Sequence, residues 1–112
     1  MKTDLQKREL IANLKKTKIN VWKAIATELE KSTKRTVGVN IAKIIRHTRE
    51  GETALIPGKV LSLGKMEKKL TVAAYNFSDK AKEKINKNGK ALTIKELLKT
   101  NPKGNKVRIL KW

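Results

Sequence analysis

The stretch from residue 55 to residue 77 constrains the fold most, because its pattern predicts consecutive strands. Proline cannot donate a ladder hydrogen bond and glycine accepts a positive φ, so the chain is expected to turn at Pro57-Gly58 and again at Gly64. The pattern therefore predicts a small sheet whose lysines lie on exposed edges. The apolar runs lie at residues 53–56, 60–63 and 70–75, and the edge lysines are Lys59, Lys65, Lys68 and Lys69.

Helical periodicity is present before and after this stretch. The expected helices span residues 3–16, 20–31, 41–48, 78–88 and 94–100, and further short strands are expected at residues 91–92 and 107–110. The basic segment 34–40 is interpreted as a loop that ends at the N-cap residue Asn40. We predict an α/β fold in a single compact domain over residues 1–112, with N-terminal helices (about 1–50) before a small sheet with interleaved short helices (about 51–112).

The net charge of the chain points to a polyanionic partner. Lysine and arginine number 28 against 10 acidic residues, which gives +18. Residues 1–50 carry +8 and residues 51–112 carry +10, so the excess is not confined to a tail. Lysine is also a common solvated surface residue, but so large an imbalance exceeds the mixed-sign surface of an ordinary small domain. Nucleic acid is the leading candidate for the partner.

The sequence argues against catalysis, metal binding and membrane insertion. It has no cysteine and one histidine, His47, which cannot supply a set of metal ligands or a serine triad with a nucleophile elbow. Five residues instead of four separate Gly58 from Gly64, and Met66 stands where a phosphate loop needs Ser or Thr. No secretory or membrane-spanning stretch is present. We expect no catalytic residue, metal, cofactor or small-molecule substrate, and a soluble cytoplasmic protein.

The best candidate contact surface is the outer face of the third expected helix and its flanks. Arginine forms bidentate contacts with phosphate, and three of the five arginines, Arg35, Arg46 and Arg49, fall within this short segment. Alternatively, Arg46 and Arg49 only cap the end of the helix. Trp22 lies on an apolar helical face and is interpreted as core, with base stacking as the alternative.

The few aromatic residues favour a folded RNA that is recognised by its shape. A single tyrosine and a single phenylalanine cannot form the paired platform of a single-strand binder. Duplex DNA is the alternative, although no helix-turn-helix or zinc-finger spacing is visible. A free-standing protein that packages DNA is therefore the competing function to RNA binding.

Two motifs in the central stretch carry a family resemblance. Residues 57–61 read Pro-Gly-Lys-Val-Leu and residues 71–74 read Thr-Val-Ala-Ala, with Trp22, Val39-Asn40 and Asn101-Pro102 as further markers. With these residues the chain resembles the eighteenth large-subunit ribosomal protein family of archaea and eukaryotes, a family related in fold to bacterial large-subunit protein fifteen. The length of the chain favours an archaeal-type member.

The resemblance implies a structural role in the large ribosomal subunit, where the protein binds and stabilises folded rRNA beside neighbouring ribosomal proteins. It implies neither an enzyme nor a homo-oligomer. Combined with the charge pattern, it gives twelve expected RNA contacts: Lys15, Lys16, Lys18, Lys34, Arg35, Lys43, Arg46, Arg49, Lys59, Lys65, Lys103 and Arg108.

Overall fold

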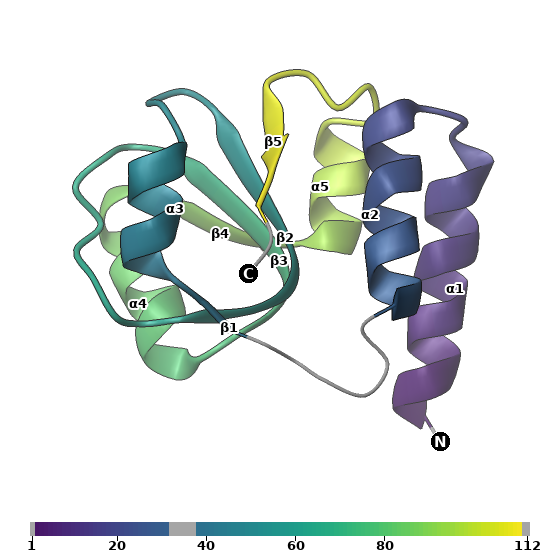
Figure 1. The fold of residues 1–112 in the computed structure, drawn as a ribbon, viewed down its shortest axis with the longest axis horizontal. Coiled ribbons are helices and arrows are strands. Elements are labelled where there is room, and N and C mark those ends of the chain that lie inside the picture. The colour runs from purple at the N-terminus through teal and green to yellow at the C-terminus, as the bar shows by residue number, and fades with distance from the viewer. Residues whose placement is uncertain (1, 32–37, 111–112) are drawn as a thin grey trace.

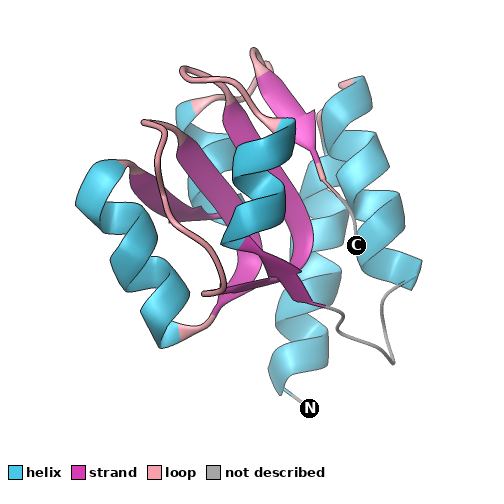
Figure 2. Ribbon diagram, turned by 60° about the vertical axis from the view of Figure 1, so that its left-hand side comes forward, coloured by secondary structure: helices cyan, strands magenta, loops and turns pink. Residues whose placement is uncertain are grey.

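A computed structural model describes the backbone of residues 2–31 and 38–110 and the side chains of residues 8–30 and 38–110. Within these residues, helices cover both faces of one twisted sheet (Figures 1 and 2). The elements in chain order are α1 (Lys2–Lys16), α2 (Asn20–Lys31), β1 (Gly38–Asn40), α3 (Ile41–His47), β2 (Thr53–Leu61), β3 (Thr71–Phe77), α4 (Asp79–Asn88), β4 (Lys90–Thr93), α5 (Ile94–Thr100) and β5 (Val107–Ile109). This arrangement confirms the predicted α/β class.

All strand pairs of the sheet are parallel, and β2 is its centre. One edge of β2 pairs with β3, which in turn pairs with β4. The other edge is shared: β5 pairs with residues 53–55 and β1 pairs with residues 59–61. The longest strand therefore holds three others in place.

The predicted turn at Pro57-Gly58 is wrong, because β2 continues through these residues as a single strand. Ile56 lies opposite Ala74 and Lys59 lies opposite Asn76, so three steps along β2 match two steps along β3. The extra residue makes a β-bulge, where a residue is left unpaired and a proline without an N–H group is tolerated. Lys59 consequently lies in the middle of the sheet and not at its edge.

Side chains that alternate along the strands build two cores, one on each face of the sheet. Ala54 and Ile56 of β2 join the core under α3 and α4, together with Val39 of β1. Leu55 joins the opposite core with residues of α1, α2 and α5, and the fully buried Trp22 belongs to this core. The interpretation of Trp22 as core is confirmed, and its indole N–H donates to the carbonyl of Pro102 at 2.8 Å.

The handedness of parallel crossovers explains which helix covers which face. The chain steps from β1 to β2, β3 and β4 in one direction across the sheet, and α3 and α4 lie on the same face. The return from β4 to β5 goes the other way, and α5 lies on the opposite face. Right-handed connections require this change of face when the direction reverses.

Local signals correctly located the helix starts in the second half of the chain. Ser78 caps α4, and Thr93 with Glu96 forms the expected capping box of α5. The cap hydrogen bonds of Thr93 lower the pKa of the Glu96 carboxyl. Residues 38–40, expected to be loop, instead form strand β1, because β2 offers them a free edge.

The outer edge of β4 is closed by side chains. The N–H group of Ala91 donates to Oδ1 of Asn86 at 3.0 Å, and the N–H group of Thr93 donates to Oε1 of Glu96 at 3.0 Å. Both donors are therefore unavailable to a further strand, a common protection of sheet edges. None of the helices within residues 2–31 and 38–110 is long and apolar enough to span a bilayer.

Replacing Gly64 by alanine is expected to destabilise the fold by about 2 kcal/mol or more. Gly64 lies in the β2–β3 connection at φ +119°, and a Cβ atom there would lie 2.4 Å from the backbone nitrogen of Ala42. Gly51 is a matched control: it has φ +86° with nothing within 4 Å of the added atom. Its replacement should therefore cost about 1 kcal/mol, from backbone strain alone. Urea unfolding of both variants measures the difference, and equal losses would contradict the close approach.

Candidate nucleic-acid interface

The outer face of α3 is basic, as predicted. Ile41 and Ile44 are fully buried against the sheet, which turns Arg46 and His47 outward on the opposite face of the helix. Arg49 follows the helix and is also exposed. These side chains form an accessible cationic surface that is fixed in place by the buried face of the same helix.

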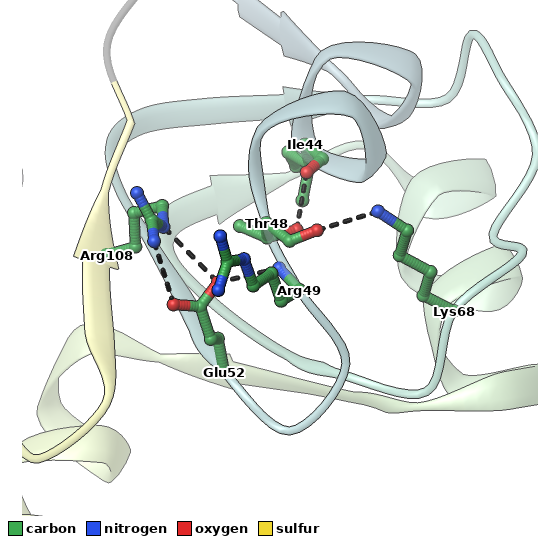
Figure 3. A network of polar contacts seen from close by, with 6 residues as sticks. All are labelled: Ile44, Thr48, Arg49, Glu52, Lys68 and Arg108. Carbon is green, nitrogen blue, oxygen red and sulfur yellow. Dashed lines mark hydrogen bonds and ion pairs between the residues drawn. The ribbon is translucent and has the colours of Figure 1, made fainter.

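Lys68 stabilises the C-terminal end of α3 (Figure 3). Its ammonium group comes from the β2–β3 connection and donates to the carbonyl oxygens of Ile45 and Thr48, both at 2.7 Å. A cation bonded to the last carbonyls of a helix also complements its dipole. Lys68 therefore caps the end of α3, a role that was the alternative interpretation of Arg46 and Arg49. Lys68 was expected on an exposed sheet edge and is instead half-buried.

Glu52 organises the loop after α3 by accepting hydrogen bonds from two arginines (Figure 3). Arg49 donates its backbone N–H to Oε1 at 2.6 Å, and Arg108 of β5 donates from Nε at 3.2 Å and from Nη2 at 3.0 Å. The Arg108 side chain, then the Arg49 N–H, lowers the pKa of Glu52, and Glu52 raises the pKa of Arg108. The charge of Arg108 is therefore partly neutralised within the protein, although the side chain remains exposed.

Two further lysines have partners inside the chain. Lys84 of α4 donates to the carbonyl oxygens of Ser62 at 2.8 Å and Gly64 at 3.1 Å, which fixes the β2–β3 connection. Lys15, an expected RNA contact, forms an ion pair with Glu30 of α2. These contacts separate lysines that stabilise the fold from lysines whose charge is available to a partner.

Helix C-termini bring cations together at the end of the sheet where the strands begin, which we call the amino end. The crossover helices α3, α4 and α5 run in the opposite direction to the strands, and α1 runs in the same direction as these helices. The last turns of all four helices therefore lie at this end (Figure 1). Cations are favoured in such turns by the helix dipole. The basic residues in these last turns are Lys15 and Lys16 of α1, Arg46 and His47 of α3, Lys87 of α4 and Lys99 of α5.

Loops add more cations to the amino end. Lys18 lies in the α1–α2 turn, and Lys103 lies in the α5–β5 turn whose Pro102 carbonyl accepts from Trp22 of α2. Arg49 lies after α3. Lys16, Lys18, Lys103, Arg46 and Arg49 are all exposed, so this surface combines five of the twelve expected contacts.

Of the seven remaining expected contacts, Lys15 and Arg108 are paired with Glu30 and Glu52, and the other five lie elsewhere or lack a described position. Lys59 is half-buried within β2, and Lys43 is half-buried on α3 with a partner of its own. Lys65 is exposed in the β2–β3 connection, which hydrogen-bonds α3 through the carbonyl of Leu63 and the N–H of Ala42. Lys34 and Arg35 lie outside the described residues.

The list of expected RNA contacts left out several exposed lysines of the amino end. The carbonyl of Lys69 accepts from Gly51, and the carbonyl of Lys106 accepts from Thr53, so both loops pack beside the first residues of β2. Lys69 and Lys90 border a hollow of about 280 Å³ at this end. For Lys87 and Lys99, the position in the last turn of a predicted helix was a signal that the sequence offered. The missed residues are Lys69, Lys87, Lys90, Lys99 and Lys106.

Replacing Lys68 by methionine is expected to lower the free energy of unfolding by about 2 kcal/mol, because two carbonyls lose charge-assisted hydrogen bonds. Its neighbour Lys69 is exposed, so Lys69→Met removes the same charge and should change stability by less than about 0.5 kcal/mol. Chemical denaturation compares the pair. A Lys68→Met protein as stable as the Lys69→Met protein would show that the cap contributes nothing.

Comparison with known proteins agrees with the resemblance seen in residues 57–61 and 71–74. The family model described as "Ribosomal protein 60S L18 and 50S L18e" matches residues 8–112. This range includes every element from the middle of α1 to β5.

Curated archaeal relatives match over nearly their full length. "Large ribosomal subunit protein eL18" of Methanosphaerula palustris is 47% identical over 98% of this chain and 95% of its own. The proteins of the same name from Methanospirillum hungatei and Methanococcus maripaludis are 47% and 45% identical, over 92% and 98% of this chain and 89% and 96% of their own. The chain belongs to the family of the 60S L18 and 50S L18e ribosomal proteins.

Proposed function

We propose that the chain is a structural constituent of the large ribosomal subunit that binds and stabilises folded rRNA. Its relatives carry the name of a large-subunit protein. The observation that carries RNA binding is the charge excess: if each of the 10 carboxylates paired with one cation, 18 of the 28 cations would still lack an acidic partner. A polyanion is the partner that neutralises such a surface.

The amino end of the sheet is the proposed main contact surface. Its cations come from four helix ends and several loops, so it is held by the rigid scaffold of the sheet. Arg46 and Arg49 extend from the end of α3 that Lys68 stabilises, which reduces the entropy lost when their guanidinium groups bind phosphate. We infer that this surface spans phosphates from more than one RNA segment and so stabilises their packing.

The proposed recognition depends on phosphates and RNA shape more than on base sequence. Lysine and arginine contacts to phosphate fix the position of a protein and read no sequence by themselves. The proposed partners are large-subunit rRNA and the ribosomal proteins that lie beside it. The proposed role is binding, and no catalytic step is included.

In cell extracts, a tagged copy of the chain is expected to sediment with large ribosomal subunits through a sucrose gradient and to remain with them in a high-salt wash. A protein bound at a specific site binds more tightly than a non-specific binder, so it should remain on the subunit at salt concentrations that release non-specific binders. If the chain is recovered with chromatin and is absent from large ribosomal subunits, the result would support DNA packaging and overturn the ribosomal proposal. The matched family favours the ribosomal outcome.

Replacing Arg46 or Arg49 by glutamine is expected to weaken rRNA binding and to reduce the slope of log K against log salt by about 0.7–0.9 for each lost phosphate contact. Filter binding at several salt concentrations measures the slope. Lys84→Met is the control, because its ammonium group is bonded to the carbonyls of Ser62 and Gly64 and the slope should stay unchanged. An unaltered slope for both arginine variants would remove α3 from the contact surface.

A further inference from the structure

A hollow of about 630 Å³ lies at the carboxyl end of the sheet, opposite the proposed phosphate-binding surface. Its volume is typical of pockets that hold small ligands. Four elements contribute its walls: α1, the last residues of β3, the end of β4 at Thr93, and the start of α5. The wall residues that matter here are Leu10 and Asn13 of α1, Tyr75 and Asn76 of β3, and Ile94 and Lys95 of α5.

Chain topology explains why a hollow exists at this place. From the end of β3 the chain passes to α4 on one face of the sheet, and from the end of the neighbouring β4 it passes to α5 on the opposite face. When connections leave adjacent parallel strands toward opposite faces, a crevice opens beyond their carboxyl ends, and open α/β sheets bind ligands there. Helix α1 closes the side of this crevice.

The wall chemistry fits a planar group that has an apolar face and a polar edge. The half-buried Leu10 supplies apolar surface, and the half-buried Tyr75 supplies an aromatic ring. The oxygen of the Asn76 amide accepts from the N–H of Phe77 at 2.9 Å, which leaves its nitrogen as the group that can donate to a ligand. A nucleobase has this combination of stacking face and hydrogen-bonding edge.

The remaining polar and charged residues of the wall also fit a nucleobase. Asn13 offers a second amide from the exposed side of α1, and amides pair well with base edges. Glu9 can accept from an exocyclic amine, whereas its charge disfavours phosphate inside the hollow. Lys95 at the start of α5 can contact the phosphate of a nucleotide whose base lies between the walls.

We propose that this hollow binds one unpaired nucleobase that is extruded from the RNA. The inference rests on the proposed function, because the rRNA bound at the amino end would supply the base. A single tyrosine accounts for one stacked base and not for a row of them. The phosphates would then be held at one end of the sheet and a base at the other.

The test compares binding of the full chain and its variants to an in vitro transcript of Methanococcus maripaludis large-subunit rRNA. Tyr75→Ala should bind about tenfold more weakly at every salt concentration, because one stacked base is lost and no phosphate contact changes. Tyr75→Phe should bind within about twofold of the wild type, since the ring remains. Asn13→Ala, at an exposed helix position where alanine is the best helix former, should bind about fivefold more weakly without loss of stability.

The affinity for rRNA and the cross-linked products decide between the outcomes. If Tyr75→Ala and Asn13→Ala both bind the transcript as tightly as the wild type, the base pocket is overturned and the proposed function stays intact. If the wild type does not bind rRNA, the proposed function is overturned. In isolated large subunits, ultraviolet light should cross-link the Tyr75 peptide to a nucleotide. A cross-link from the Tyr75 peptide to another protein would overturn the assignment to RNA. So would a cross-link that free mononucleotides suppress but the transcript does not.

Discussion

The pairing of β2 with three other strands is the interaction on which the rest of the structure depends. β3 occupies one edge of β2, and β5 and β1 share the other, so residues 38–40 and 107–109 meet on one strand. Alternate side chains of β2 enter the two cores, which are covered by different helices. Loss of this strand would therefore separate both helical layers at once, which explains why its buried residues are apolar throughout.

A parallel sheet gives the molecule two chemically different ends. Helix C-termini, with the cations that their dipoles favour, are brought to the amino end of the strands. The carboxyl end receives the connections that leave toward opposite faces, and the larger hollow lies there. The same topology thus produces the cationic surface proposed to bind phosphate and a separate cavity from one short chain.

The cations of this protein divide into two groups by their contacts. Lys68 and Lys84 each bond two backbone carbonyls, and Arg108 is paired with Glu52. Arg46, Arg49 and Lys103 are exposed on the surface. Composition cannot make this distinction, because a lysine bonded to carbonyls and a lysine in solvent contribute the same formal charge.

The sequence by itself determined the helices, the apolar role of Trp22, the capping box of α5, the family and the charge excess that favours a polyanionic partner, because each depends on local spacing or on a sum over residues. Tertiary structure alone decided that Pro57-Gly58 forms a bulge, that residues 38–40 form a strand, and that Lys68 caps α3. These features depend on partners about 20 residues away along the chain. A local pattern contains no information about which distant strand edge or helix end a residue will meet.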